Sequence, residues 1–468
     1  MRIFYPILTI AIFAFFVSFN TGCKKGNFTS NGTLTFSSDT LVFDTVFTTI
    51  GSVTKNFKFY NNDNKPLTVS KIKLMGGDNS PYRINVDGLS GNEFNEINIE
   101  GNDSLYVFVE VTLDPNNQLN PVVIEDSIQF TTNGVVQYVQ LASWGQDMYY
   151  HYKDVFPVIA ADTTWANDKP HVIYGYSAVD SAKTLNIQAG TDIYLHKNAI
   201  LYVYKGALNI NGTLNNPVTL QGDRLEMAYD DVSGQYYGIY FQEAMPSSID
   251  YAIIKNGTSG VHLFSEDPAN SGYTLTLTNT KIFNCARYGV FIYSGAKVKA
   301  ENCLIYKNLN HSLLVLEGGD FNFNHCHLLG YSSDGGQNPA VGLSNTYYNP
   351  LLGTTFISSI EEGVITNSVI YGDLEQELAF DTISDPAITL SFQFENNLIR
   401  SSTIFTESFF NNNIWNQSPQ FKDALENDFE FWSSSPLRDA GNNLFFSPTD
   451  ILGTSRVNTP DIGAFELY

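Results

Sequence analysis

Acidic side chains gather in two segments of this 468-residue sequence, and carboxylates in pairs or threes are the groups that do acid and base chemistry or bind Ca²⁺. The first segment holds Asp223, Glu226, Asp230 and Asp231, and the second holds Asp373, Glu375, Glu377, Asp381 and Asp385. Neither has the regular spacing of a Ca²⁺ loop, and solvated acidic loops are usual in a protein rich in carboxylates. The sequence therefore predicts no cofactor and leaves Ca²⁺ binding as an open alternative.

The tripeptide His325-Cys326-His327 places three metal-ligand side chains in a row. In a strand the side chains alternate, so the two imidazoles lie on one side and the thiol on the other, and the three cannot hold one ion without a bend. We expect Cys326 to lie inside, next to Cys303 of the preceding repeat, with both histidines at the surface. With Cys285 these are three cysteines outside the N-terminal segment, and this odd number indicates no disulfide framework. No metal site is predicted.

Composition limits the kind of molecule that positions these groups. Lys and Arg number 25 against 48 Asp and Glu, which gives a formal net charge of −23, and only 16% of residues are charged where soluble proteins average about 25%. Such a chain would repel phosphates, so a nucleic-acid partner is excluded. At 43% apolar residues the chain is able to bury a large core.

The N-terminus has the features of a secretory signal. Met1-Arg2 precedes an apolar run from Ile3 to Phe19, which is short for a spanning helix of about 20 residues. The following Asn20-Thr21-Gly22-Cys23 resembles the lipobox of bacterial lipoproteins, although Asn20 stands where that motif has an aliphatic residue. The resemblance implies a signal peptide over 1–22, acylation of Cys23 and a membrane-lipid partner; the alternative is an uncleaved anchor. Lys24-Lys25 after the cysteine favours an outer-membrane lipoprotein that faces the periplasm or the cell surface.

Residues 27–148 alternate apolar and polar side chains in short runs separated by turn residues. Phe57-Lys58-Phe59 and the run from Leu105 to Val109 are examples. Seven or so such runs predict an antiparallel β-sandwich. The segment resembles the immunoglobulin-like domains that precede long repeat regions in secreted bacterial proteins.

The remainder of the chain repeats with a unit of about 23 residues. Ile282, Ile305 and Leu328 are spaced by 23 and 23, in frames such as Asn302-Cys303-Leu304-Ile305. A second repeating pattern runs in parallel with the first. Its frames begin at Gly238, Gly260, Gly289 and Ser312, which are separated by 22, 29 and 23 residues. A unit of this length with two or three strands predicts the coil of a parallel β-helix, which buries its apolar side chains by stacking on the next coil.

This segment resembles the right-handed parallel β-helix family, which has the pectin lyase-like fold, and the handedness is taken from that resemblance. The predicted fold is therefore all-β, an antiparallel sandwich followed by a right-handed parallel β-helix. Its predicted parts are the sandwich at 27–148, a connector or N-terminal cap at 149–183, the β-helix at 184–440 and a C-terminal cap at 441–468.

Strand alternation in the second repeating pattern identifies an outer face. Because residues such as Val290 and Ile292 are apolar in every coil, they face inward and their neighbours face outward. Two outer columns follow, Tyr240, His262, Phe291 and Leu314 in one and Gln242, Phe264, Tyr293 and Leu316 in the other. An apolar face of this extent must be covered, either by the chain itself, through the sandwich, the connector or the loop from Asp223 to Gln235, or by a ligand or partner. We predict a ligand site at Tyr240, His262, Phe264, Phe291 and Tyr293, where aromatic rings would stack on a glycan or a protein.

The C-terminus, from Ser418 to Glu466, resembles the closing pattern of secreted bacterial β-helix proteins of the choice-of-anchor type. We expect this segment to cover the unpaired edge of the last coil. Ion pairs among Asp450, Arg456, Asp461 and Glu466 are predicted to lock it, against the alternative of a catalytic carboxylate cluster.

Catalysis is not favoured by the motifs. Pectate lyases need a Ca²⁺ carboxylate cluster with a base, and polygalacturonases need several Asp with Gly-His-Gly and Arg-x-Lys motifs. Asp230-Asp231 is the only Asp pair, and both of those motifs are absent. The sequence predicts no catalytic residues and favours a membrane-anchored binding protein for a glycan or a protein. A polysaccharide lyase or glycoside hydrolase, and a structural surface spacer, remain the alternatives.

Overall fold

The computed structural model describes residues 28–29, 32–48, 51–114, 122–152, 158–266, 272–331, 337–456 and 459–467. The chain forms two compact units, of which the first ends at Asp147 and the second begins at Met148. The predicted signal peptide and Cys23 lie outside the described residues.

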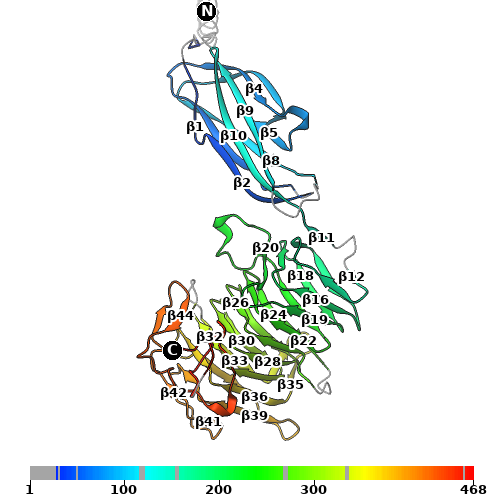
Figure 1. Ribbon diagram of the computed structural model, residues 1–468, viewed down its shortest axis with the longest axis vertical. Coiled ribbons are helices and arrows are strands. Elements are labelled where there is room, and N and C mark those ends of the chain that lie inside the picture. Colours follow the sequence, from blue (N-terminus) through cyan, green and yellow to red (C-terminus); the bar gives the residue numbers. More distant parts are fainter. Residues whose placement is uncertain are drawn as a thin grey trace, which may run out of the picture. The chain divides into compact units, whose positions relative to one another are not determined.

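The first unit is a sandwich of two sheets (Figure 1). One sheet contains, in spatial order, β1 (Thr35–Phe36), β3 (Lys55–Asn61), β8 (Asp103–Val111), β5 (Tyr82–Val86) and β6 (Leu89–Gly91). The other contains β2 (Thr40–Phe47), β10 (Val135–Gln146), β9 (Val122–Thr132), β4 (Leu67–Leu74) and β7 (Glu93–Ile99), and the 3₁₀ turn η1 (Gly77–Asn79) follows β4. Alternate residues of each strand, such as Phe57 and Phe59 of β3, are buried between the sheets, as the alternating pattern predicts.

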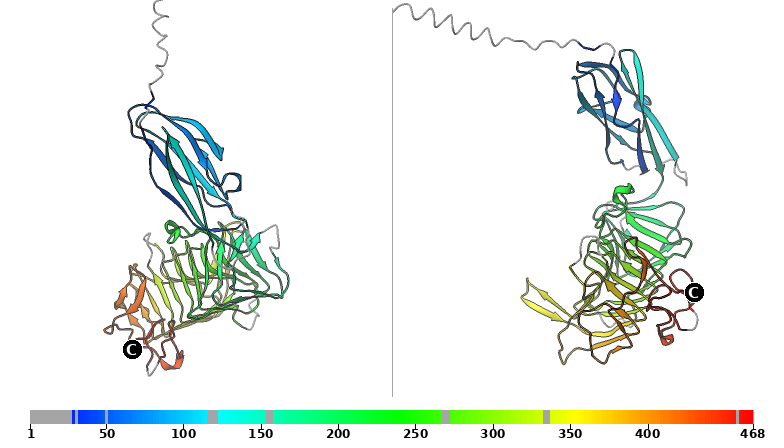
Figure 2. Two further views of the ribbon diagram at one scale, coloured as in Figure 1. Left: turned by 45° about the horizontal axis from the view of Figure 1, so that its top comes forward. Right: turned by 90° about the vertical axis from the view of Figure 1, so that its left-hand side faces the viewer.

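The second unit is a parallel β-helix, whose described residues form three long sheets (Figures 1 and 2). The eleven-stranded sheet contains β11 (Tyr149–Tyr152), β14 (His171–Tyr174), β17 (Asp192–Leu195), β20 (Val218–Gly222), β23 (Ala252–Lys255), β26 (Lys281–Phe283), β29 (Leu304–Tyr306), β32 (His327–Gly330), β37 (Val369–Gly372), β40 (Leu398–Ile399) and β42 (Ile414–Trp415). The nine-stranded sheet contains β12 (Val158–Ile159), β15 (Tyr176–Val179), β18 (Ile200–Tyr204), β21 (Gly238–Gln242), β24 (Ser259–Phe264), β27 (Tyr288–Tyr293), β30 (His311–Leu316), β33 (Val341–Ser344) and β38 (Leu378–Asp381). The ten-stranded sheet contains β13 (Thr163–Trp165), β16 (Thr184–Gln188), β19 (Ala207–Asn211), β22 (Ser247–Asp250), β25 (Leu275–Thr278), β28 (Lys297–Glu301), β31 (Asp320–Asn324), β36 (Ile360–Thr366), β39 (Leu390–Glu395) and β41 (Phe410–Asn411).

The predicted stacking of the coils is confirmed. Ile282 pairs with Ile305, and Ile305 with Leu328, in parallel register on β26, β29 and β32. These side chains are fully buried in one continuous core, where each contributes about 1.5–3 kcal/mol by leaving water. The predicted order of a sandwich followed by a parallel β-helix is therefore confirmed. The parallel strands begin at Tyr149 in β11, earlier than the expected residue 184.

A column of left-handed residues explains the Asn frames of the sequence. Between the ten-stranded and eleven-stranded sheets, one residue of each coil from β25 onward has positive φ, from 45° to 54°: Asn279, Asn302, His325, Asn367, Asn396 and Asn412. Asparagine tolerates this conformation better than other residues with a Cβ atom, so it recurs at this corner. The corner fixes where each coil turns and thereby keeps successive strands in register.

The last coils end in an aromatic cluster. Phe380, Phe394, Phe405, Phe410 and Trp415 pack together, with centroid separations such as 4.9 Å between Phe394 and Phe410. This cluster closes the apolar core at the C-terminal end of the coil stack. The remaining elements are the 3₁₀ turns η2 (Met227–Tyr229) and η3 (Asn443–Phe445), the hairpin β34 (Thr346–Asn349) and β35 (Thr354–Ile357), and the pair β43 (Phe421–Asp423) and β44 (Asp428–Phe431). The hairpin, yellow in Figure 2, extends away from the coils.

Candidate functional site

The predicted outer columns exist on the nine-stranded sheet. Tyr202, Tyr240, His262 and Phe291 pair in succession on β18, β21, β24 and β27. Their ring centroids are 5.5, 4.6 and 4.5 Å apart in that order. We call these four residues the aromatic ladder. Each is half-buried, because the neighbouring rings cover much of its surface.

The second column runs beside the ladder, through Tyr204, Gln242, Phe264, Tyr293 and Leu316. Phe264 and Tyr293 are in ring contact at 5.5 Å, and the Tyr202 hydroxyl donates to Gln242. All five predicted ligand residues therefore lie on one continuous face. The sequence prediction missed Tyr202 and Tyr204, which continue the two columns on the preceding coil. The same alternation of inward and outward residues could have identified them.

His262 is held as a neutral ring inside the ladder. Its Nδ1 is 2.7 Å from the Tyr237 hydroxyl oxygen. Burial lowers the pKa of His262 to about 4, because the charged form would lose its hydration. At neutral pH the imidazole is thus uncharged and extends the aromatic surface between Tyr240 and Phe291 without adding a positive charge.

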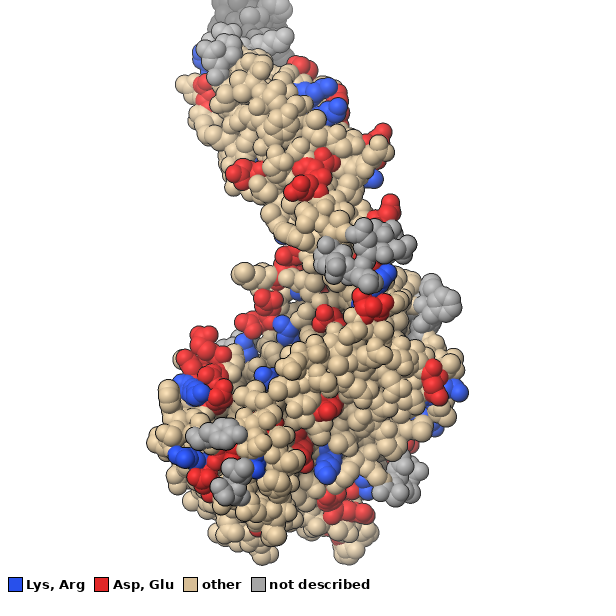
Figure 3. Space-filling model, viewed as in Figure 1, with Lys and Arg blue, Asp and Glu red and all other residues tan. Residues whose placement is uncertain are grey.

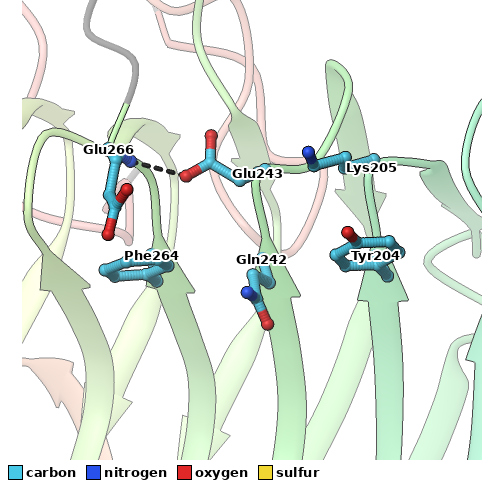
Figure 4. A pocket seen from close by; sticks show the side chains of 6 residues that line it. All are labelled: Tyr204, Lys205, Gln242, Glu243, Phe264 and Glu266. Carbon is cyan, nitrogen blue, oxygen red and sulfur yellow. Dashed lines mark hydrogen bonds between the residues drawn. The ribbon is translucent and has the colours of Figure 1, made fainter.

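A shallow pocket of about 410 Å³ lies on the second column (Figure 4). Tyr204, Gln242 and Phe264 line it from three adjacent strands, and Lys205, Glu243 and Glu266 line its rim where the chain turns toward the ten-stranded sheet. The Glu243 carboxylate accepts the backbone N–H of Glu266 at 2.6 Å, which fixes the rim. The Lys205 Nζ is 5.5 Å from the Tyr204 ring centroid. The pocket thus has the rings of Tyr204 and Phe264 on either side of the Gln242 amide. Charged side chains of both signs lie at its rim.

A second pocket, of about 250 Å³, shares Glu266 with the first and extends along the same corner. In it Lys297 Nζ pairs with Asp320 Oδ2 at 2.9 Å, while Asp320 Oδ1 accepts the N–H groups of Glu361 and Glu362 at 2.8 and 3.0 Å. Asp320 is therefore engaged on both oxygens. The nearby Glu317 carboxyl has its pKa raised, chiefly by burial and further by Glu266.

The face of the β-helix visible in Figure 3 carries several groups of Lys, Arg, Asp and Glu side chains, separated by wide uncharged areas.

Sequence reasoning missed one pair of polar side chains, His196 and Asp223. His196 Nδ1 is 2.7 Å from Asp223 Oδ2, and the Tyr174 ring stacks on the imidazole at 3.9 Å. The three residues come from consecutive coils of the eleven-stranded sheet, at or directly after the ends of β14, β17 and β20. The repeat register could have found them, had it been extended to the earlier coils.

Two polar contacts of the loop from Asp223 to Gln235 lie away from the aromatic ladder. Asp231 pairs with Lys307 at 3.1 Å, and the Asp230 carbonyl accepts from Asn256 at 3.0 Å. Both partners lie where the chain passes from the eleven-stranded to the nine-stranded sheet. Among the described residues, no group of three or more His, Cys, Asp or Glu side chains could hold a metal ion.

The expectation that His325 and His327 lie at the surface is wrong. Both point outward from the coil but are completely buried. His327 Nδ1 accepts the N–H of Ala464 at 2.8 Å, and burial lowers its pKa to about 3. Cys326 lies in the core beside Cys303, as predicted, and Cys303, Cys326 and Cys285 are all free and buried.

The C-terminal segment covers His325 and His327. The sequence predicted that this segment lies over the last coil. It packs instead against the outer side of the eleven-stranded sheet, where one apolar cluster joins Phe429, Phe431, Leu437, Ile451, Ile462, Ala464 and Phe465 to Leu304, Tyr306, Leu329, Val369 and Leu398. The sheet face is apolar at those positions, so burying it is more favourable than covering the end, which the aromatic cluster already fills.

Within this segment the four predicted residues have different roles. Arg456 Nη1 pairs with Glu466 Oε2 at 2.9 Å, and both side chains are buried. Asp450 and Asp461 accept backbone N–H groups instead, such as those of Glu466 at 2.9 Å and Leu467 at 2.7 Å. The carboxylates therefore organise irregular backbone, and only Glu466 forms an ion pair with Arg456.

The described part of the chain contains no helix that is both long and apolar enough to cross a bilayer. No curated protein matches the sequence.

Similar solved structures are distant. A GH87 α-1,3-glucanase catalytic unit from Streptomyces thermodiastaticus is 10% identical, with 77% of this chain and 89% of that chain covered and a TM-score of 0.27. A family 123 glycoside hydrolase from Clostridium perfringens is 10% identical, with 27% of this chain and 31% of that chain covered and a TM-score of 0.18. The E. coli chaperone DraB is 10% identical, with 24% of this chain and 54% of that chain covered and a TM-score of 0.17. The last two alignments span about a third and about half of those proteins, and likenesses this low bear on neither substrate nor activity.

One family matches the sequence, the one described as the right handed beta helix region, over residues 179–328 and 218–421. The two ranges contain most strands of the three parallel sheets and all of the aromatic ladder. Together they span just over half of the chain, which therefore belongs to the right-handed β-helix family.

Proposed function

We propose that the protein is a membrane-anchored, extracytoplasmic binding protein that recognises a glycan on the outer face of the nine-stranded sheet. The observation that supports this most is the pocket in which Tyr204 and Phe264 flank Gln242, next to the aromatic ladder. Binding sites for small polar ligands combine aromatic walls with a few placed polar groups, and this pocket has both.

The groups of the pocket suit the two kinds of surface of a sugar. The C–H face of a pyranose ring is apolar and packs on an aromatic ring, while its hydroxyls need donors and acceptors. Tyr204 and Phe264 offer the rings, Gln242 offers an amide, and Lys205 and Glu243 offer a donor and an acceptor at the rim. Because the rim charges are of both signs, a neutral glycan is the expected ligand.

The contacts of Asp320 count against the rival function, a glycan-degrading enzyme. A glycosidase needs two free carboxyl groups that face each other across the bond to be cleaved. Asp320, in the adjoining pocket, is engaged by Lys297 and by two backbone N–H groups, so it is poorly placed to act as acid or base. A lyase would release unsaturated products that absorb ultraviolet light, and their appearance would contradict the proposal.

Tyr204 and Tyr176 provide a matched pair of variants. Both lie on the nine-stranded sheet and are similarly exposed, at 36% and 38%, but only Tyr204 lines the pocket. We expect Tyr204→Ala to weaken glycan binding about tenfold, which corresponds to about 1.4 kcal/mol, while Tyr176→Ala binds as the wild type does. Affinity electrophoresis against neutral and acidic polysaccharides measures this. Equal affinity of the two variants would contradict the site.

Anchoring through Cys23 is the second part of the proposal, and the lipobox-like Asn20-Thr21-Gly22-Cys23 supports it. Cells that express the chain with labelled palmitate should incorporate the label, and Cys23→Ala should abolish incorporation. Recovery of the unlabelled wild-type chain in the soluble periplasmic fraction would contradict anchoring. A protein that only projects the sandwich, as a spacer, would be anchored but would bind no glycan through Tyr204.

A further inference from the structure

The sandwich has a pocket of its own, on the outer face of the sheet formed by β1, β3, β8, β5 and β6. It measures about 430 Å³, which is within the range of about 300–1,000 Å³ of small-molecule sites. Phe108 of β8 lines it, together with Arg83 and Asn85 of β5, Ser90 of β6, Asn92, and Glu110 of β8. Strand pairing places Asn85 and Asn56 on either side of Phe108, and Arg83 opposite Glu110.

Phe108 is the aromatic side chain that borders this pocket on the outer face of the sheet. It is 38% exposed, whereas its neighbours on the same strand, Val107 and Val109, are fully buried in the core of the sandwich. The adjacent Tyr106 is stacked beside it at 5.7 Å and 20°, but the Lys58 Nζ lies 4.5 Å from the Tyr106 ring centroid. The ammonium therefore occupies one face of Tyr106, while Phe108 borders the pocket.

The polar groups around Phe108 are held in place. Arg83 donates from Nη1 to the carbonyl oxygens of Ser80 and Tyr82 at 2.5 and 2.8 Å, so the guanidinium is fixed at one nitrogen. Glu110 Oε1 accepts the Thr54 hydroxyl at 2.6 Å. Groups that are ordered before a ligand arrives lose less entropy when they bind it, which favours affinity.

We propose that this pocket is a second carbohydrate site, which stacks one pyranose ring of a neutral glycan on Phe108. Arg83 donates to the sugar hydroxyls and Glu110 accepts from them. A guanidinium and a carboxylate on the same pocket leave no net charge to attract an anionic or cationic sugar, and this selects a neutral one. The proposal does not depend on the pocket of the β-helix.

The test compares four forms of the whole chain from residue 24 onward: the wild type, Phe108→Ala, Tyr138→Ala and Tyr204→Ala. Tyr138 is the control, because it is 45% exposed on β10 of the other sheet and lines no part of the pocket. Cellohexaose, laminarihexaose, xylohexaose and mannohexaose are titrated by calorimetry, with hexagalacturonate as the anionic comparison. Urea unfolding of each variant verifies that its fold is retained.

We expect at least one neutral hexaose to bind with Phe108→Ala weakened about tenfold and Tyr138→Ala unchanged, and hexagalacturonate to bind more weakly than that hexaose. If Phe108→Ala binds as the wild type does, this site is refuted, whatever Tyr204→Ala does. If Tyr204→Ala has no effect but Phe108→Ala does, the β-helix site fails and this one stands. A preference for hexagalacturonate, or no binding of any neutral hexaose, overturns the proposal.

Discussion

Removal of the buried Arg456 side chain tests the account of the C-terminal segment. Arg456 is 3% exposed and donates to Glu466 Oε2 and the Gly463 carbonyl, each at 2.9 Å, and to Asn302 Oδ1 at 3.2 Å. Asn302 belongs to the corner of the coils, so this guanidinium joins the C-terminal segment to the β-helix. Arg456→Met keeps much of the volume and removes the charge and all of these donors.

The expected loss is large because the partner charge stays behind. Breaking a buried ion pair by removing one member costs about 3–5 kcal/mol, since the other charge is left buried without compensation. The Glu466 side chain is only 6% exposed. The same segment offers a control, Lys422 with Glu430, whose Nζ and Oε2 are 2.7 Å apart but whose side chains are 33% and 41% exposed. An exposed pair contributes about 0–1 kcal/mol, so Lys422→Met should have little effect.

Urea unfolding followed by tryptophan fluorescence measures both changes. We expect Arg456→Met to lower the free energy of unfolding by about 3–5 kcal/mol, or to detach the C-terminal segment first, which limited proteolysis would detect. The double variant Arg456→Met, Glu466→Gln should regain part of the loss because the stranded charge is gone. A loss below about 1 kcal/mol, or no recovery in the double variant, would refute the reasoning.

Three further predictions concern the β-helix. Burial raises the pKa of Glu377 from 4.5 to about 7. The free energy of unfolding should therefore be highest below about pH 4.5 and should fall by about 3 kcal/mol as the pH rises from there through 7. Glu377→Gln should abolish this pH dependence, which urea titrations at several pH values measure. Gly238 has φ of 138° and a Cβ there would overlap the Ser259 carbonyl oxygen, so Gly238→Ala should lower the thermal midpoint by many degrees, unlike Gly272→Ala, whose Cβ meets no atom of the described residues within 4 Å. Cys285, Cys303 and Cys326 are fully buried, so a thiol reagent should leave all three unmodified until urea is added; reaction in the native state would contradict their placement.

The repeat was predictable because it follows from local chemistry. Each coil needs inward apolar residues at fixed positions and a residue that tolerates the left-handed corner, and the sequence repeats both, as Ile282 with Asn279 and Ile305 with Asn302 illustrate. Strand alternation then decides which side chains face outward. For that reason the periodicity of the sequence was enough to assign the columns of Tyr240 and Phe264.

The pockets were harder to predict, because they form where side chains of one column meet turns of several coils. Tyr204, Glu243 and Glu266 come together through the stacking of three coils with turns of different length. Strand pairing places Arg83 opposite Glu110 although 27 positions separate them in the sequence. No local pattern encodes such a meeting.

The sequence by itself determined the all-β class, the parallel coils, the buried column of Ile282, Ile305 and Leu328, and the aromatic face, since all of these depend on periodicity within a coil and from one coil to the next. Only the tertiary structure decided that the C-terminal segment packs on the side of the β-helix and buries His325 and His327. That contact joins His327 to Ala464, which is 137 positions away in the sequence. The apolar surface that drives it is indistinguishable, in sequence, from one that faces solvent or a ligand.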